Sequence, residues 1–401
     1  MRYHVWLRIV SRHDAQSTAA QFVFFIILCV CLLFLATGCG SAPSAEDLRS
    51  VTFVPSSGGD WPVSTPEAEG LDPLLVARLY YNAAALETLY GVLVIKNDKL
   101  VAEKYFNKGS LSQTSGRMSM TKSVTSAVVG VALARGDLKS LDSKMLDFFP
   151  EYAEKVTDPR KKEITIRQLL QMRAGYPWEE HYSDIFERVF LRNNWSWLPH
   201  IEDVPLVADP GTAFGYSNFS SHLLAIIAAR ACGVDIMPYA QEHIFTPIGA
   251  RIEQWTADPY GYRWGHWEIY LTARDMARFG LLYQHGGAWQ GKQVLPAAWV
   301  RDSLRRYSEG INFSGWLSSE LGKYFRDLGY GYQWWSARVG DHHFDFAWGH
   351  GGQLIVLLKP LNMIVVTTAD PLYYKPAEAG WAYEGAIIDL VGEFISTLPV
   401  R

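Results

Sequence analysis

The chain has 401 residues, of which 49% are hydrophobic and 19% are charged, and its formal net charge is -4. This length and composition allow a large buried core and exclude long disordered regions. Lysine and arginine form no block or stripe, so we expect no nucleic-acid partner. One catalytic unit with an inserted subdomain fits this length better than two independent domains.

Residues 1–39 have the pattern of an export signal. Arg2, Arg8 and Arg12 precede an apolar run from Phe22 to Ala36, and small residues stand directly before Cys39. The run is shorter than the roughly 20 residues that a membrane-spanning helix needs. Small residues before a cysteine resemble a bacterial lipobox, which would make Cys39 a lipidated first residue; an uncleaved membrane anchor is the alternative. Either way we expect an exported, membrane-anchored protein of the bacterial envelope that faces the periplasm.

Cysteine and histidine usage indicates neither a disulfide framework nor a metal site. Cys29 and Cys31 lie inside the apolar run and Cys39 at its end, which leaves Cys232 alone in the body of the chain. A single cysteine forms no disulfide framework and no cysteine-based metal site. The triplet Asp341-His342-His343 is typical of a polar turn between strands. We therefore expect no metal and no other cofactor.

The first part of the chain predicts a linker followed by alternating helix and strand patterns. A Gly-Ser-Pro-rich stretch is typical of a tether, and a polar pair between two apolar runs is typical of a hairpin. In chain order we expect a linker over residues 40–60, a helix over Leu74–Thr88, a β-hairpin of Tyr90–Lys96 and Leu100–Phe106 around Asn97-Asp98, and a helix from Ser119 to Arg135 before Gly136.

The remainder predicts helices first and strands near the end. The clearest elements are helices over Ile166–Arg173, Ser221–Ala231 and Ala273–Gln284, strands over Leu354–Leu358 and Asn362–Thr368, and a helix over Trp381–Leu398. Strands at both ends with helices between them predict an α/β (α+β) fold. In it, terminal helices flank a central antiparallel sheet, and residues 140–345 form a mainly helical insertion. We expect one domain over residues 61–400, with the active site in the cleft between sheet and insertion.

Ser119-Met120-Thr121-Lys122 is the only Ser-x-x-Lys in the chain. Three residues apart on a helix, the two side chains share a face, so the lysine amine can take the proton of the serine hydroxyl. Small apolar residues after Lys122 and the helix N-terminus beside Ser119 suit this chemistry. Taken alone, the tetrad is also compatible with chance and with Ser119 as a plain N-cap.

Two further motifs lie downstream. Tyr216-Ser217-Asn218 follows a Pro-Gly loop, where a phenol can relay a proton and an amide can hold both a lysine and a substrate carbonyl. Gly349-His350-Gly351-Gly352-Gln353 leads into an apolar strand, where backbone N–H groups can complete an oxyanion hole with that of Ser119. Candidates for an apolar acyl pocket are Trp178, Trp264, Trp267, Trp334, Trp335 and Trp348.

In this order the three motifs resemble those of the penicillin-recognising serine hydrolases. Across roughly residues 60–400 the chain resembles the class C β-lactamase-related superfamily, and within it the 6-aminohexanoate-dimer hydrolases and related esterases. The resemblance implies the β-lactamase/penicillin-binding-protein fold. It also implies catalytic roles for Ser119, Lys122 and Tyr216, and substrate or oxyanion roles for Asn218, Gly349, His350 and Gln353.

The third motif departs from many relatives, which carry Lys-Thr-Gly with a lysine that binds a substrate carboxylate. If Ala347-Trp348-Gly349 takes the place of that triplet, no cation remains and the N–H of His350 is the oxyanion donor. If His350-Gly351-Gly352 takes it, His350 replaces the lysine and the donor is the N–H of Gln353. We prefer the first register. Both registers weaken recognition of an anionic substrate and disfavour β-lactams.

These features predict a serine hydrolase that acts on esters or small amides through a Ser119 acyl-enzyme. A D-alanyl peptidase or class C-like β-lactamase is the first alternative, and a non-catalytic envelope lipoprotein is the second. The expected partners are a small-molecule ester or amide and, through the N-terminus, a membrane. The sequence does not indicate an oligomeric state.

Overall fold

The computed structural model describes residues 44–49, 51, 60–179, 198–312, 321–373 and 378–400. Leu48–Arg401 groups into one compact unit. The predicted export signal with Cys39 lies outside the described residues, as does most of the predicted 40–60 linker, in which the short helix α2, Ala45–Arg49, is described.

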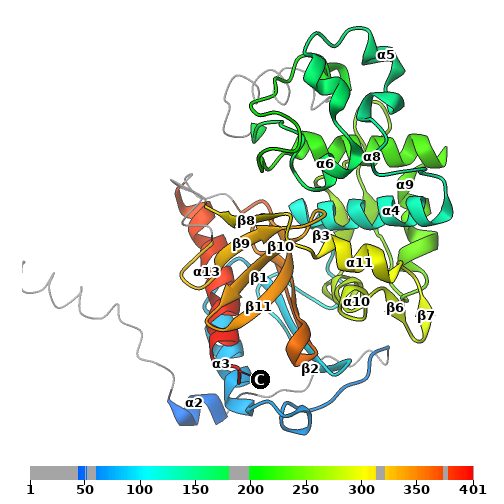
Figure 1. The fold of residues 1–401 in the computed structure, drawn as a ribbon. Helices are drawn as coiled ribbons and strands as arrows, with labels where there is room; N and C mark the ends of the chain where they lie inside the picture. Colours follow the sequence, from blue (N-terminus) through cyan, green and yellow to red (C-terminus); the bar gives the residue numbers. More distant parts are fainter. Residues whose placement is uncertain are drawn as a thin grey trace, which may run out of the picture. The chain divides into compact units, whose positions relative to one another are not determined.

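The centre of the compact unit is an eight-stranded antiparallel sheet in the order β2-β1-β13-β12-β11-β10-β9-β8 (Figure 1). Strands β1 and β13, far apart in the sequence, are neighbours in this sheet, and Val94 lies opposite Val365. The strands are β1 Leu89–Lys96, β2 Lys99–Tyr105, β8 Ser308–Ile311, β9 Arg326–Tyr330, β10 Trp335–Val339, β11 His342–Gly349, β12 Gln353–Leu358 and β13 Met363–Ala369. The predicted central antiparallel sheet is confirmed.

Helices cover both faces of this sheet. Helices α3, Pro73–Ala84, and α13, Glu378–Ser396, pack on each other and on one face, whereas α10, Ala273–Gln284, packs on the other (Figure 1). Along β12, Ile355 and Leu357 belong to the core with α10, and Leu354 and Val356 belong to the core with α3 and α13. Burial on both faces explains why this strand is apolar at every position after Gln353.

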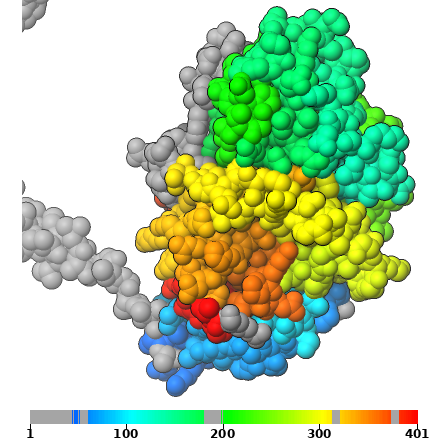
Figure 2. Space-filling view, viewed as in Figure 1, coloured from blue at the N-terminus to red at the C-terminus, as the bar shows by residue number. Residues whose placement is uncertain are grey.

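The predicted helical insertion is present but shorter than expected. It contains α5 Pro150–Ala153, α6 Ile166–Leu170, α8 Asn218–Cys232, α9 Ile236–Ala240 and α11 Ala297–Ser303, and it packs on α4, Thr121–Arg135, which precedes it. In Figure 2 the yellow segment, which includes α11 and β8, lies between the green helical segments and the orange strands. The expected end near residue 345 is wrong, because β8, β9 and β10 already belong to the sheet. These strands are four or five residues long, too short to show a clear alternation in the sequence.

Turn residues agree with the predicted boundaries at several places. Asn97 and Asp98 have φ of 50° and 67°, as both central residues of a type I′ hairpin turn require. Gly136 ends α4 at φ 81° and Gly233 ends α8 at φ 67°. Helix α3 stops at Ala84, before the predicted end, because the chain turns there into β1.

Within the described residues, no single helix has both the length and the apolar composition for crossing a membrane. Asn218–Cys232 and Ile236–Phe245, bent by 83° at a short break, pass that test only as a pair.

Candidate active site

Ser119 lies in a tight turn at the start of α4. The turn is the 3₁₀ segment Met118–Met120, entered through Met118 with a φ of 45°. A positive φ in a non-glycine residue is typical of a constrained functional turn. The cap position of α4 is Met120 and receives no side-chain hydrogen bond. Ser119 is therefore not the helix cap, and its partly exposed hydroxyl is engaged elsewhere.

The amine of Lys122 faces oxygen atoms from three different elements. Its Nζ lies 2.8 Å from Ser119 Oγ, 2.7 Å from Asn218 Oδ1 and 3.3 Å from the carbonyl oxygen of His266. The side chain is almost wholly buried, at 1% exposure. The structure thus brings the predicted pair Ser119 and Lys122 together and adds the predicted Asn218.

Tyr216 covers the remaining side of the lysine. Lys122 Nζ lies 4.8 Å from the centroid of the Tyr216 ring. The ring is held by Trp178 and Trp335, whose centroids lie 5.0 and 5.3 Å from its own. Burial and the neighbouring Tyr216 hold the pKa of the Tyr330 phenol well above its usual value, so that group stays neutral.

The start of α8 positions Tyr216 and Asn218, and it is fixed by a carboxylate that the sequence analysis missed. Glu179 is fully buried and accepts hydrogen bonds from Ser217 Oγ at 2.5 Å and from the backbone N–H groups of Asn218 and Phe219 at 3.0 and 3.1 Å. Burial raises the pKa of Glu179 to about 7. No local motif marks this residue, since it lies 39 positions before Asn218 in the chain.

The loop that offers the His266 carbonyl is anchored by buried polar contacts. Thr125 Oγ1 donates to the carbonyl of Gly265 at 2.8 Å, and the Gly265 N–H donates to His222 Nδ1 at 3.3 Å. The second ring nitrogen of His222 lies 3.1 Å from Asp258 Oδ2, so that nitrogen carries the proton. Burial, and next the positive charge of Lys122, lowers the pKa of His266 well below its usual value. This loop is thereby a rigid acceptor for the lysine.

The end of β11 lies directly against the nucleophile turn. A Cβ on Gly349 would lie 2.2 Å from the Arg117 carbonyl oxygen and 3.1 Å from the Met120 nitrogen, so only glycine permits this approach. A Cβ on Gly352 would instead meet Ile387 of α13 at 2.8 Å. This placement favours the register in which Ala347-Trp348-Gly349 replaces Lys-Thr-Gly, with His350 next to the nucleophile turn.

The side chain of Gln353 does not make the substrate contact that was predicted for it. It is wholly buried, its Oε1 accepts from Arg117 Nη1 at 2.9 Å, and its Nε2 donates to the Ala369 carbonyl at 2.8 Å. Both ends of the amide are therefore used inside the protein. The Gln353 side chain supports the residue two positions before the nucleophile and does not face a substrate.

The six candidate tryptophans divide into three groups. Trp178, Trp335 and Trp348 lie along the wall that starts at Tyr216, with Trp335 and Trp348 centroids 5.8 Å apart. Trp264 and Trp267 pack around His266. Trp334 packs against Tyr283 in the core at 1% exposure, so its predicted place in the acyl pocket is wrong.

No group of three or more His, Cys, Asp or Glu side chains within the described ranges could hold a metal ion. His342, from the Asp341-His342-His343 triplet, directs its Nε2 to the carbonyl of Leu398 at 3.1 Å. The site therefore has to be understood from its serine, lysine, tyrosine and amide groups.

Comparison with known proteins identifies the family. A family model described as Beta-lactamase matches residues 84–377, well over half of the chain. The chain belongs to the beta-lactamase family. The family is hydrolytic, and the fold expected from the sequence is confirmed for this beta-lactamase-family protein.

The chain is similar in sequence to a protein that carries a different name from its family. The 6-aminohexanoate-dimer hydrolase of Paenarthrobacter ureafaciens is 26% identical over 256 residues, which is 61% of this chain and 63% of that enzyme. The chain thus spans less than two thirds of the curated relatives that it matches.

Two solved structures illustrate the fold. The octameric penicillin-binding protein homologue from Pyrococcus abyssi superposes with a TM-score of 0.59 at 18% identity, covering 79% of this chain and 77% of that one. The D-stereospecific amidohydrolase from Streptomyces sp. has a TM-score of 0.56 at 14% identity, covering 78% and 96%. At these identities the likeness concerns the fold alone.

Proposed function

We propose that this beta-lactamase-family protein is a serine hydrolase that acts on esters or small amides through an acyl-enzyme on Ser119. The observation that carries the proposal is the position of Lys122 Nζ, 2.8 Å from Ser119 Oγ and 2.7 Å from Asn218 Oδ1. A serine hydroxyl becomes a useful nucleophile when a neighbouring base accepts its proton, and the amine of Lys122 is in reach to do so once it has released its own proton.

The proposed reaction has two halves. Ser119 Oγ attacks the substrate carbonyl while its proton passes to the unprotonated amine of Lys122. The backbone N–H groups of Ser119 and His350 stabilise the oxyanion. The Tyr216 phenol gives its proton to the departing alcohol or amine and takes up the proton held by Lys122. Water then attacks the acyl-enzyme, its proton follows the same route back, and Ser119 is regenerated.

The surroundings support a neutral rather than an anionic substrate. In the favoured register no lysine takes the place of the Lys-Thr-Gly cation, and the neighbouring His350 contacts the Glu384 carboxylate instead. The aromatic wall from Tyr216 to Trp348 suits an apolar acyl or leaving group. The name of the Paenarthrobacter relative, a hydrolase of the 6-aminohexanoate dimer, supports small amides as substrates.

Turnover of p-nitrophenyl esters by variants tests this proposal. We expect Ser119→Ala to lose turnover and fluorophosphonate labelling. Lys122→Arg should lose at least ~100-fold in kcat, because a guanidinium is always protonated and cannot act as the base. Ser396→Ala, at the far end of α13 with its hydroxyl on the Glu393 carbonyl, is the matched control. Full activity in Ser119→Ala would exclude Ser119 as the nucleophile.

The alternatives from the sequence predict other outcomes. Rapid acylation by a fluorescent penicillin would favour a D-alanyl peptidase if the acyl group stays bound, or a β-lactamase if it is released. A purified protein that Ser119-directed probes do not label would favour a non-catalytic binding role.

We also propose that the chain is exported and held at a membrane through lipidated Cys39. The basic residues, the short apolar run and the small residues before Cys39 support this. Incorporation of labelled palmitate into wild type and its loss in Cys39→Ala would support the lipoprotein. Membrane retention without labelling would favour the uncleaved anchor.

A further inference from the structure

The turn at the end of β11 contains three glycines and one residue with a side chain, His350. Gly349 is pressed against the nucleophile turn, Gly351 has φ 82° with a would-be Cβ 2.9 Å from the Asp370 carbonyl, and Gly352 has φ 91° against α13. A segment of glycines has little conformational restraint of its own. His350, whose N–H is the proposed oxyanion donor, is thus the residue through which a side chain can fix this turn.

The ring of His350 contacts a buried carboxylate. His350 Nδ1 lies 2.7 Å from Glu384 Oε2, which is an ion-pair contact when the ring is protonated. The Glu384 side chain is wholly inaccessible to solvent, whereas that of His350 is 41% exposed. The contact therefore runs from the protein interior, on α13, outward to the mouth of the site.

The same carboxylate holds the last bulky residue of β11. Trp348 Nε1 donates to Glu384 Oε1 at 2.5 Å. Trp348 and His350 flank Gly349, so the two oxygens of one carboxylate hold the residues on either side of the glycine that touches the nucleophile turn. Among the ion pairs between described residues, Glu384 pairs with His350. Burying a carboxylate is costly unless it is hydrogen-bonded, and the Trp348 N–H supplies such a bond to Glu384.

We propose that Glu384 is a positioning residue for the oxyanion hole, acting through His350 and Trp348. This inference rests on the proposed function, since it requires that the His350 N–H binds the oxyanion. Fixing both neighbours of Gly349 sets the direction of that N–H relative to Ser119. A displacement of about 1 Å in such a donor is enough to reduce a rate substantially.

The test is steady-state hydrolysis by variants of the full chain. We expect Glu384→Ala to lower kcat for a p-nitrophenyl ester about 10- to 100-fold with little change in KM, because the contact matters when the oxyanion forms. Affinity for a boronic acid, whose tetrahedral adduct places an oxygen in the oxyanion hole, should fall by the same factor as kcat/KM. Glu384→Gln keeps one acceptor oxygen and should recover part of the loss.

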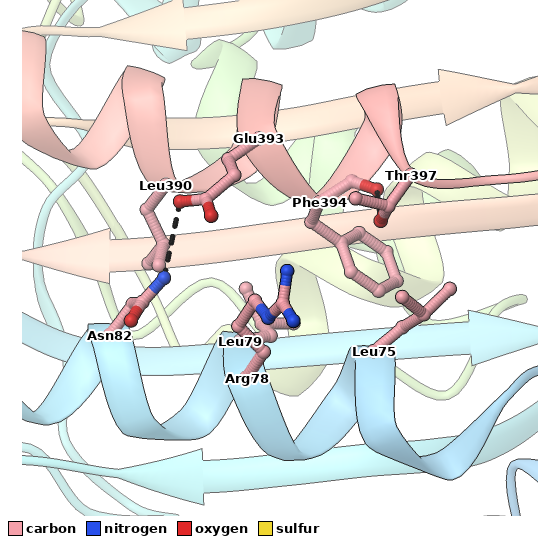
Figure 3. A pocket seen from close by; sticks show the side chains of 8 residues that line it. All are labelled: Leu75, Arg78, Leu79, Asn82, Leu390, Glu393, Phe394 and Thr397. Atoms are coloured by element: carbon pink, nitrogen blue, oxygen red, sulfur yellow. Dashed lines mark hydrogen bonds between the residues drawn. The ribbon is translucent and has the colours of Figure 1, made fainter. Parts of the chain in front are cut away.

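A matched control lies on the same helix. Glu393 of α13 accepts a hydrogen bond from Asn82 Nδ2 of α3 at 3.1 Å, in the small pocket between the two helices drawn in Figure 3. Glu393→Ala removes a carboxylate from α13 away from β11, and we expect it to leave kcat and boronic acid affinity unchanged. Thermal unfolding of every variant separates a loss of α13 packing from a loss of positioning.

Two further variants keep the inference testable if Glu384→Ala unfolds. Trp348→Phe retains the aromatic ring but removes the N–H, and His350→Ala retains the backbone N–H but removes the contact with Glu384. Each should lower kcat, and combining either with Glu384→Gln should cost less than the sum of the single losses. A rise in KM with kcat intact would instead make Glu384 and His350 substrate contacts and overturn the positioning role. Wild-type protein without Ser119-dependent turnover would refute the proposed function itself, which is a distinct result.

Discussion

The buried carboxyl of Glu179 makes the stability of the folded protein depend on pH. Burial raises its pKa to about 7, against about 4.5 for a glutamate side chain in water. The folded protein therefore keeps this proton to a higher pH than the unfolded chain does. The stability that Glu179 contributes is complete below about pH 4.5 and is lost as the pH rises through about 7.

This linkage gives a prediction for Glu179→Gln. Between pH 4.5 and 7 the wild type should lose up to roughly 3 kcal/mol of unfolding free energy relative to this variant, which has no carboxyl to ionise at that position. Urea denaturation of both proteins across this range measures the difference. A constant difference over the whole range would mean that Glu179 does not titrate there.

At the scale of elements, the residue that caps α8 lies between two residues of the candidate site. Ser217 is the N-cap, with its Oγ accepting from Ser220 N at 3.0 Å while its hydroxyl donates to Glu179. Helix formation at this point places Asn218 beside Lys122 and leaves Tyr216 in the preceding loop. The cap is therefore part of what aligns two of the proposed catalytic groups.

Ser217→Ala should accordingly lower the free energy of unfolding by more than the loss of an ordinary N-cap does. Loss of an N-cap hydroxyl costs about 1 kcal/mol, and leaving the buried Glu179 short of a donor adds about 1–3 kcal/mol. We expect a fall in kcat as well. Thr165→Ala, at the N-cap of α6, where the hydroxyl accepts from Gln168 N at 3.3 Å, is the control and should show the first cost alone. Equal stability losses in the two variants would contradict the role of the Glu179 contact.

The sequence predicts those elements whose signal is local. The Asn97-Asp98 hairpin, α10 over Ala273–Gln284 and the stop at Gly136 each depend on turn chemistry or on helical periodicity within one segment. The short strands β8 to β10 were missed because their stability comes from neighbours in the sheet. Among site residues, Ser119, Lys122 and Asn218 belong to motifs, whereas Glu179 and Glu384 act across long sequence separations and carry no local mark.

At the scale of the whole molecule, a buried ion pair joins the beginning of the compact unit to α10. Arg274 donates to both carboxylate oxygens of Glu103, on β2, at 2.8 and 2.7 Å. The Glu103 side chain is fully buried, and Arg274 also pairs with Asp60. This cluster connects three distant parts of the chain on one side of the sheet.

Arg274→Met should therefore destabilise the entire unit. Removing one partner of a buried pair leaves an uncompensated carboxylate and costs about 3–5 kcal/mol. Lys144→Ala, which breaks an exposed pair with Glu163, is the control and should cost less than about 1 kcal/mol. The unfolding midpoints of both variants in urea decide the comparison, and similar small shifts would show that Glu103 is hydrated after the change.

The pairing of Val94 with Val365 also has a consequence for how the protein is made. On the ribosome, β1 emerges before β13, the strand that joins the β1–β2 hairpin to the rest of the sheet. Until then the β1–β2 hairpin carries an open edge and an uncovered apolar face, which is the condition under which chains associate with one another. A chain released before Met363 could not close its sheet at all. Folding of this sheet is thus tied to the synthesis of β13, and until then the open edge favours association between chains.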